Sequence, residues 1–135
     1  GNLLNTWQYG GVDWDLCFDF EILNDGTFIM SGYTFNNTAG TLNNPDLYIL
    51  KVDTFGSVLW EKRYGYPGQD YTQGRKSLYV DDDYIMAAAR HEKMDGSYAG
   101  WLLKMNMQGD TLWSKFYEQE LVYSFLKGVE KVMFL

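Results

Sequence analysis

The sequence predicts an all-β protein built from repeated four-stranded antiparallel sheets. Three observations support this prediction. Apolar side chains alternate with polar ones at a period of two, turn signals rich in Asn, Asp and Gly separate these runs, and the same order of blocks recurs at a spacing of about 53 residues. The 3.6-residue period of an amphipathic helix is absent, and β-branched and aromatic residues dominate the runs.

The first full repeat predicts four strands. Leu16, Phe18, Phe20 and Ile22 alternate with other residues and are followed by the hairpin signal Asn24-Asp25-Gly26. Further strands are predicted over 28–33, 47–52 and 58–64, with a polar loop over 36–46 and a tight turn over 53–56. The second repeat predicts strands over 72–80, 84–90, 100–105 and 111–117.

The repeat itself is read from matched blocks. GSVLWEKRYG from Gly56 matches GDTLWSKFYE from Gly109, and GNLLNTWQYG from Gly1 is a third copy in which Asn5 replaces the tryptophan and Trp7 comes two positions later. LYILKVDTFG (47–56) matches GWLLKMNMQG (100–109), and TFIMSGY matches DYIMAAA with Ile-Met aligned. Matched blocks in the same order indicate a repeat architecture.

Four antiparallel strands in about 53 residues is the size of one β-propeller blade. About two and a half such blades fit this chain. The expected division is the last strand of a preceding blade over 1–15, two blades over 16–68 and 69–121, and the first strand of a following blade over 122–135. Because isolated blades leave apolar faces and open edges, we expect either a longer propeller chain or other copies or partner proteins to complete the ring.

The blocks resemble a bacterial β-propeller repeat of secreted and cell-surface proteins, particularly of the Bacteroidetes type. The residues that carry the resemblance are Asp13-Trp14, Asp25-Gly26, Ser31-Gly32, Asp46 to Asp53, Gly56, Leu59-Trp60 and Tyr64-Gly65. Asp81-Asp82-Asp83 and Glu118 depart from the pattern. The resemblance implies an extracellular or surface location in a bacterium and a structural role. A looser likeness to the tryptophan-docking repeats of quinoprotein dehydrogenases lacks the residues of a quinone site.

Composition narrows the possible functions. The chain has 135 residues, 46% of them hydrophobic, and a net charge of −7, which is typical of a globular protein and disfavours binding to nucleic acid. No apolar run approaches the roughly 20 residues that span a bilayer, so membrane insertion is not expected. One cysteine, Cys17, and one histidine, His91, give little material for a catalytic triad or a multi-cysteine metal site.

The candidate site residues are aromatic. Flat rings at loop edges stack on sugars, so the residues proposed for ligand binding are Tyr33, Tyr48, Tyr66, Tyr98 and Trp101. Packing between blades is the competing explanation for the same rings. Asp13 and Asp70 precede aromatic residues at matched positions and are expected to cap backbone amides, and Asp81 to Asp83 are expected to form a solvated turn. His91 is expected in an exposed loop, and Cys17 is expected to pack on a strand.

The sequence therefore predicts a non-enzymatic structural or recognition segment, with no cofactor, metal or catalytic residue. Two alternatives remain open: a propeller that binds carbohydrate or another ligand through its loop aromatics, and a part of a larger enzyme whose site lies in other blades.

Overall fold

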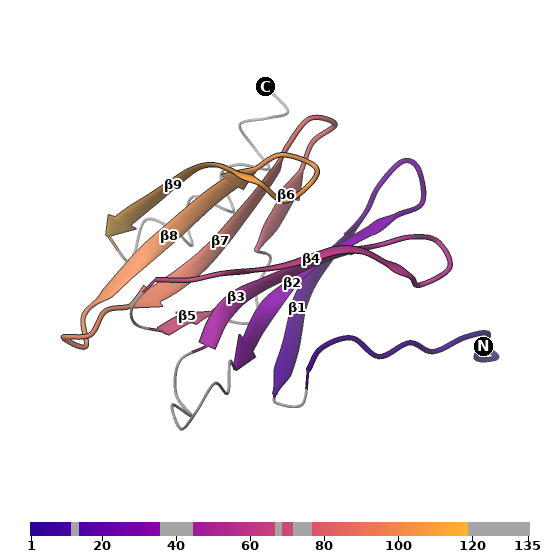
Figure 1. The fold of residues 1–135 in the computed structure, drawn as a ribbon, viewed down its shortest axis with the longest axis horizontal. Coiled ribbons are helices and arrows are strands. Elements are labelled where there is room, and N and C mark those ends of the chain that lie inside the picture. The colour runs from indigo at the N-terminus through magenta and orange to yellow at the C-terminus, as the bar shows by residue number, and fades with distance from the viewer. Residues whose placement is uncertain (12–13, 36–44, 67–68, 72–76, 119–135) are drawn as a thin grey trace.

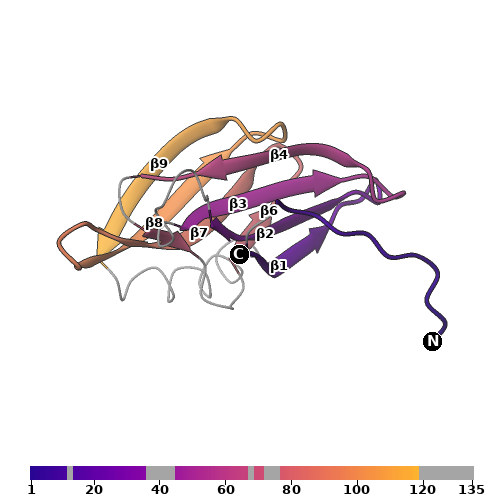
Figure 2. The same cartoon turned by 60° about the horizontal axis from the view of Figure 1, so that its bottom comes forward.

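The computed structural model describes residues 1–11, 14–35, 45–66, 69–71 and 77–118. The described part contains two antiparallel sheets and no helix (Figures 1 and 2). The first sheet is a meander of β1 (Asp15–Ile22), β2 (Phe28–Phe35), β3 (Pro45–Val52) and β4 (Val58–Tyr64), in that order across the sheet. The expectation of an all-β chain with four-stranded antiparallel sheets is confirmed.

The second sheet repeats this meander with its first strand in two pieces. Its strands are β5 (Gln69–Tyr71), β6 (Leu78–Val80), β7 (Ile85–Glu92), β8 (Tyr98–Met105) and β9 (Thr111–Glu118). Both β5 and β6 pair with β7, whose other edge pairs along its length with β8, and β9 follows β8. Together β5 and β6 hold the position that β1 holds in the first sheet.

Four hairpin turns share one backbone design. In each, a glycine with φ between 80° and 84° donates its N–H to the carbonyl three residues earlier, at Gly26, Gly56, Gly96 and Gly109. A glycine in the left-handed region after a type I turn is the usual three-residue hairpin loop. Side chains reinforce the turns in matched pairs. Asp53 and Asn106 each accept two backbone N–H groups, from Phe55 and Ser57 and from Gln108 and Asp110.

Two strand predictions for the second sheet need correction. Of the strand predicted over 72–80, residues 78–80 form β6, Ser77 lies outside a strand, and 72–76 lie outside the described residues. The strand predicted over 84–90 runs instead to Glu92, so His91 lies within β7 and not in a loop. A paired turn closes the hairpin after it, where Lys93 donates to the carbonyl of Ser97 and Gly96 donates to that of Lys93.

The predicted alignment of the two Ile-Met pairs is one residue away from the observed strand register. Phe28 pairs with Val52, whereas Ile85 pairs with Met105, and Val52 and Met105 are equivalent in the repeat. Phe28 is therefore the equivalent of Ile85. A shift of one residue moves a side chain to the other face of the sheet, so Ile29 and Ile85 are not on equivalent faces of their two sheets although they match in sequence.

Candidate interaction surfaces

The two sheets pack face to face around one apolar core. Each sheet has an inner face, which lies toward the other sheet, and an outer face. The inner face of the first sheet contributes Ile29, Leu47 and Ile49, and that of the second sheet contributes Leu78, Ile85, Ala87, Ala89, Trp101, Leu103 and Met105. All ten residues are buried. Burial of such side chains is the main favourable term in stacking the sheets.

Hydrogen bonds between polar groups also join the two inner faces. The Asp19 carboxylate, on β1, accepts the backbone N–H groups of Ser77 (2.8 Å) and Leu78 (2.9 Å) in the second sheet. The hydroxyls of Ser31 and Ser77 are 2.6 Å apart and buried. Asp19 thus binds the two amides at the start of β6. Sequence reasoning missed Asp19, since nothing local marks it among alternating residues.

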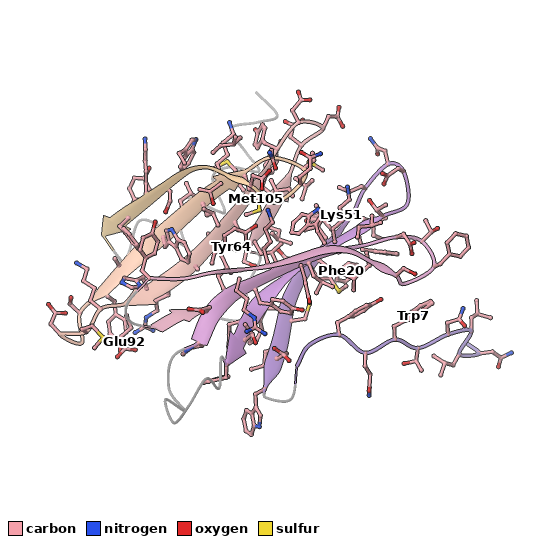
Figure 3. The ribbon with its side chains drawn as sticks, in the orientation of Figure 1. Trp7, Phe20, Lys51, Tyr64, Glu92 and Met105 are labelled. Carbon is pink, nitrogen blue, oxygen red and sulfur yellow. The ribbon has the colours of Figure 1, made fainter. Side chains whose placement is uncertain are left out.

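A second group of contacts joins β4 to the turn between β8 and β9. The Tyr64 hydroxyl donates to the carbonyl of Gly109 (2.5 Å), and the Trp60 indole N–H donates to the carbonyl of Met107 (3.0 Å). Lys62 forms an ion pair with Asp110 at 2.6 Å. Figure 3 shows Tyr64 and Met105 between the two sheets. Burial raises the pKa of the Tyr64 hydroxyl above its usual value, and the nearby Asp110 adds to the rise.

The segment 1–9 repeats two of these contacts, those of the tyrosine and the tryptophan, on the outer face of the first sheet. The Tyr9 hydroxyl donates to the carbonyl of Gly56 at 2.7 Å, and Gly56 is the equivalent of Gly109. A methyl group on Gly56 would overlap the Trp7 indole, just as one on Gly109 would lie 3.0 Å from Trp60. Trp7 therefore takes the place of Trp60, and the alignment that assigned Asn5 to that place is wrong in space.

Rows of side chains across the two sheets show which face of one sheet is equivalent to which face of the other. On the outer face of the first sheet, strand pairing places Phe20, Met30 and Leu50 side by side. On the inner face of the second sheet, Leu78, Ala87 and Leu103 form the equivalent row. The second row is covered by the first sheet. The outer face of the first sheet is thus the counterpart of the inner face of the second.

The two equivalent faces differ in what covers them. Leu78 is 1% exposed, whereas its equivalent Phe20 is 58% exposed, and Ile22 is 62% exposed. Tyr9 packs against Tyr48, Leu50 and Val52, so the β3 side of the outer face is buried while the β1 side is open. Figure 3 shows Trp7 and Phe20 on the side of the first sheet opposite Tyr64. A cavity of about 100 Å³ beneath Tyr9 also reaches Cys17 and Gly32.

Two of the proposed ligand-binding aromatics are buried, so the expectation that they are exposed at loop edges is wrong. Tyr48 is 7% exposed and Trp101 is 1% exposed. They are equivalent residues, each bonded to the neighbouring fourth strand of its sheet. Tyr48 donates to the Glu61 carboxylate, and the Trp101 indole donates to the Ser114 hydroxyl at 2.7 Å. Burial and the bond to Glu61 raise the pKa of Tyr48 above its usual value.

The other three candidates do not converge on one surface. Tyr33 contacts the rings of Phe18 and Phe35. Tyr66 is exposed and packs edge-on against Trp101 and Phe116, with ring centroids 5.3 Å and 5.0 Å apart. Tyr98 is also partly exposed.

The Tyr98 ring is covered on one side by the guanidinium of Arg90, which lies 3.4 Å from the ring centroid. Strand pairing places Tyr98 opposite Glu92, at the far end of β8 from Met105.

The lone histidine and cysteine also have defined environments. His91 is buried on β7, which contradicts the expected exposed loop, and its ring lies 5.1 Å from that of Phe116. Cys17 lies on β1 as expected but is exposed, and partial burial of its thiol raises its pKa above the usual value. A raised pKa leaves less thiolate at neutral pH and therefore less nucleophile.

An acidic hollow lies at one end of the boundary between the sheets. Its volume is about 380 Å³, and its lining includes Glu21, Asp25, Asp81, Asp82 and Lys51. Asp81 opens the turn before β7 and its side chain accepts the N–H of Asp82, in line with a turn at this position. Within the described residues, no group of three or more His, Cys, Asp or Glu side chains is placed to hold a metal ion.

Some expectations fall outside the described residues. These are Asp13, the loop over 36–44 and the strand predicted over 122–135. Asp70 lies in β5 opposite His91. Residues 1–11 contain no strand, although the contacts of Trp7 and Tyr9 place this segment where a fourth strand would lie.

No protein-family model and no curated protein matches this chain. The structure has, in its described part, no helix of the length and apolarity that crossing a membrane requires.

Proposed function

We propose that this chain is a structural and recognition module made of consecutive β-propeller blades, without enzymatic activity of its own. The single observation that carries the proposal is the repeated bond from a tyrosine hydroxyl to a turn glycine: Tyr64 to Gly109 and Tyr9 to Gly56. A head-to-tail contact that recurs from one unit to the next is how repeat proteins extend. Successive blades of a propeller are related in the same manner.

The design of each sheet supports a scaffold role. Both faces of the first sheet carry apolar side chains, with Ile29, Leu47 and Ile49 on one and Tyr48, Leu50 and Val52 on the other. A sheet that is apolar on both faces needs a neighbour on each side. The conserved geometry of the turns leaves the loops free to vary, and loops on a rigid scaffold commonly carry recognition.

The resemblance to bacterial surface repeats extends the proposal to location and partners. We propose a secreted or cell-surface protein in which the remaining blades belong to the same chain or to partner molecules. The net charge of −7 favours a partner that is not a polyanion.

Carbohydrate binding is a second candidate, favoured by the exposed rings of Tyr66 and Phe116, whose centroids are 5.0 Å apart. Exposed aromatic rings offer flat apolar faces to a sugar. Glycan-array binding that is lost in Tyr66→Ala but kept in Tyr98→Ala would support a site at this pair. Failure of the unmodified chain to bind any polysaccharide would remove the candidate.

Cooperative unfolding tests the stacked architecture. Because each sheet covers the other, the proposal predicts one urea transition, with coincident midpoints for tryptophan fluorescence and far-ultraviolet circular dichroism. Leu103→Ala, at the core between the sheets, should lower the free energy of unfolding by about 2–5 kcal/mol and shift both signals together. Two transitions at separate urea concentrations would show that the sheets fold independently and would overturn the proposal.

A further inference from the structure

The open part of the first sheet's outer face carries four apolar side chains, those of Phe20, Ile22, Phe28 and Met30. Phe28 and Met30 are half-buried and lie between the open β1 side and the β3 residues under Tyr9. Their equivalents in the second sheet, Ile85 and Ala87, are fully buried by the first sheet. This surface is therefore built for a neighbour of the kind that the second sheet already has.

We infer that the occupant of this surface is a further four-stranded sheet of the same repeat, with the segment 1–9 as its fourth strand. The inference rests on the proposed stacking of blades and names the face and the neighbour.

Position in the repeat identifies the occupant. Tyr9 and Trp7 sit on the Gly56 turn as Tyr64 and Trp60 sit on the Gly109 turn. In both described sheets the fourth strand follows the third through a turn with a positive-φ glycine, at Gly56 and Gly109. Gly1 is the matching glycine at the start of the segment 1–9, so this segment supplies the fourth strand and the occupant supplies the other three.

The geometry also says which residues each missing strand would cover. In the observed interface, β1 of the first sheet lies against β6, through the bonds from Asp19 to Ser77 and Leu78. Leu78 is the equivalent of Phe20. The first strand of the additional sheet would thus cover Phe20 and Ile22, the two side chains that are now most exposed on this face.

An extended protein tests the inference. Residues 12–55 are duplicated ahead of Gly1, so that Gly1 follows Phe55 as Gly56 does, and both copies of Cys17 are changed to Ala. A single thiol is introduced by Phe20→Cys in the original sheet, and its rate of modification by a water-soluble maleimide is compared with and without the extension. We expect the extension to slow modification at least about tenfold, as burial of Leu78 implies.

Matched controls isolate the cause. Met94→Cys, at a site that is 84% exposed, should react equally fast in both proteins. Trp7→Ala combined with Tyr9→Ala in the extended protein should restore rapid modification at position 20. A second extension, made from residues 68–108 with Gly1 in the place of Gly109, guards against a duplicate that fails to fold. If neither extension protects position 20, the inference is overturned.

Two further outcomes separate this inference from others. Protection of position 20 that grows with the concentration of the unextended chain would identify a second copy as the occupant and would overturn the inference. A Leu78→Cys variant of the unextended chain, with Cys17→Ala, should react slowly. If it reacts as fast as the Phe20→Cys variant, the stacking of the two sheets fails and the proposed function falls, whatever happens on the outer face.

Discussion

Two tyrosines, Tyr9 and Tyr64, each donate a hydrogen bond to the carbonyl of a glycine in a hairpin turn of the next unit. Two features favour glycine at each of these positions. Its φ near +80° disfavours a side chain, and an aromatic ring would crowd a Cβ. The sequence shows the glycines, tryptophans and tyrosines as repeated letters. Their pairing across sheets joins residues more than 40 positions apart and is not visible in local spacing.

Gly109→Ala and Gly96→Ala form a matched pair. Both glycines have φ near +80° and the same turn hydrogen bond, but a Cβ on Gly96 meets nothing within 4 Å. Gly96→Ala should cost only the backbone strain, about 1–2 kcal/mol. Gly109→Ala should cost a further 1–3 kcal/mol or so because it crowds Trp60 and Tyr64. Urea denaturation measures both, and equal losses would show that the ring contact carries no stability.

Tyr64→Phe should alter stability at alkaline pH. The folded-state pKa of Tyr64 is raised above the unfolded value near 10, so its contribution is present below pH 10 and is lost as pH rises toward the folded pKa. The free energy of unfolding of the unmodified chain should therefore fall more steeply between about pH 10 and 12 than that of Tyr64→Phe. At pH 7 the variant should lose about 0.5–1.5 kcal/mol through the missing hydrogen bond. Identical alkaline slopes in the two proteins would contradict the buried position of this hydroxyl.

The strands show which structural features can be read from sequence. Apolar runs bounded by turn signals correctly indicated β1 to β4 and β7 to β9. The start of β6 could not be read, since the amides of Ser77 and Leu78 bond to Asp19 of the other sheet and not to a neighbour in the sequence. The register of β7 was missed by one residue because the turn before it, which begins at Asp81, is one residue shorter than the Leu23 to Thr27 turn. His91 was placed in a loop because polar and charged residues surround it in sequence, although it lies within β7, one residue before its end.

Asp19→Ala tests the link between β1 and β6. It removes two charge-assisted hydrogen bonds to the amides of Ser77 and Leu78 and should lower the free energy of unfolding by about 1.5–3 kcal/mol. Asp82→Ala removes the same charge from an exposed turn and should stay within about 0.5 kcal/mol. Amide hydrogen exchange at Leu78 should also accelerate in Asp19→Ala alone. Equal effects of the two substitutions would assign the loss to net charge.

In the molecule as a whole, two similar sheets are stacked so that unlike faces meet: the inner face of the first sheet corresponds to the outer face of the second. A contact between different faces can repeat without limit or close into a ring. The sequence repeat predicted two similar sheets, but only the structure shows which face of one meets which face of the other. The aromatic candidates were misjudged for this reason, because Tyr48 and Trp101 face neighbouring units.

A designed disulfide between the sheets tests the stacking most directly. The hydroxyl oxygens of Ser31 and Ser77 are 2.6 Å apart and buried at the interface, and the thiol at Cys17 can be removed by Cys17→Ala. We predict that Ser31→Cys with Ser77→Cys oxidises to an intramolecular disulfide in the folded monomer, detected by a mass loss of about 2 Da and a peptide joining the two segments under non-reducing conditions. Two free thiols that stay unlinked in the folded protein, or disulfides formed only between molecules, would contradict the face-to-face arrangement of the two sheets.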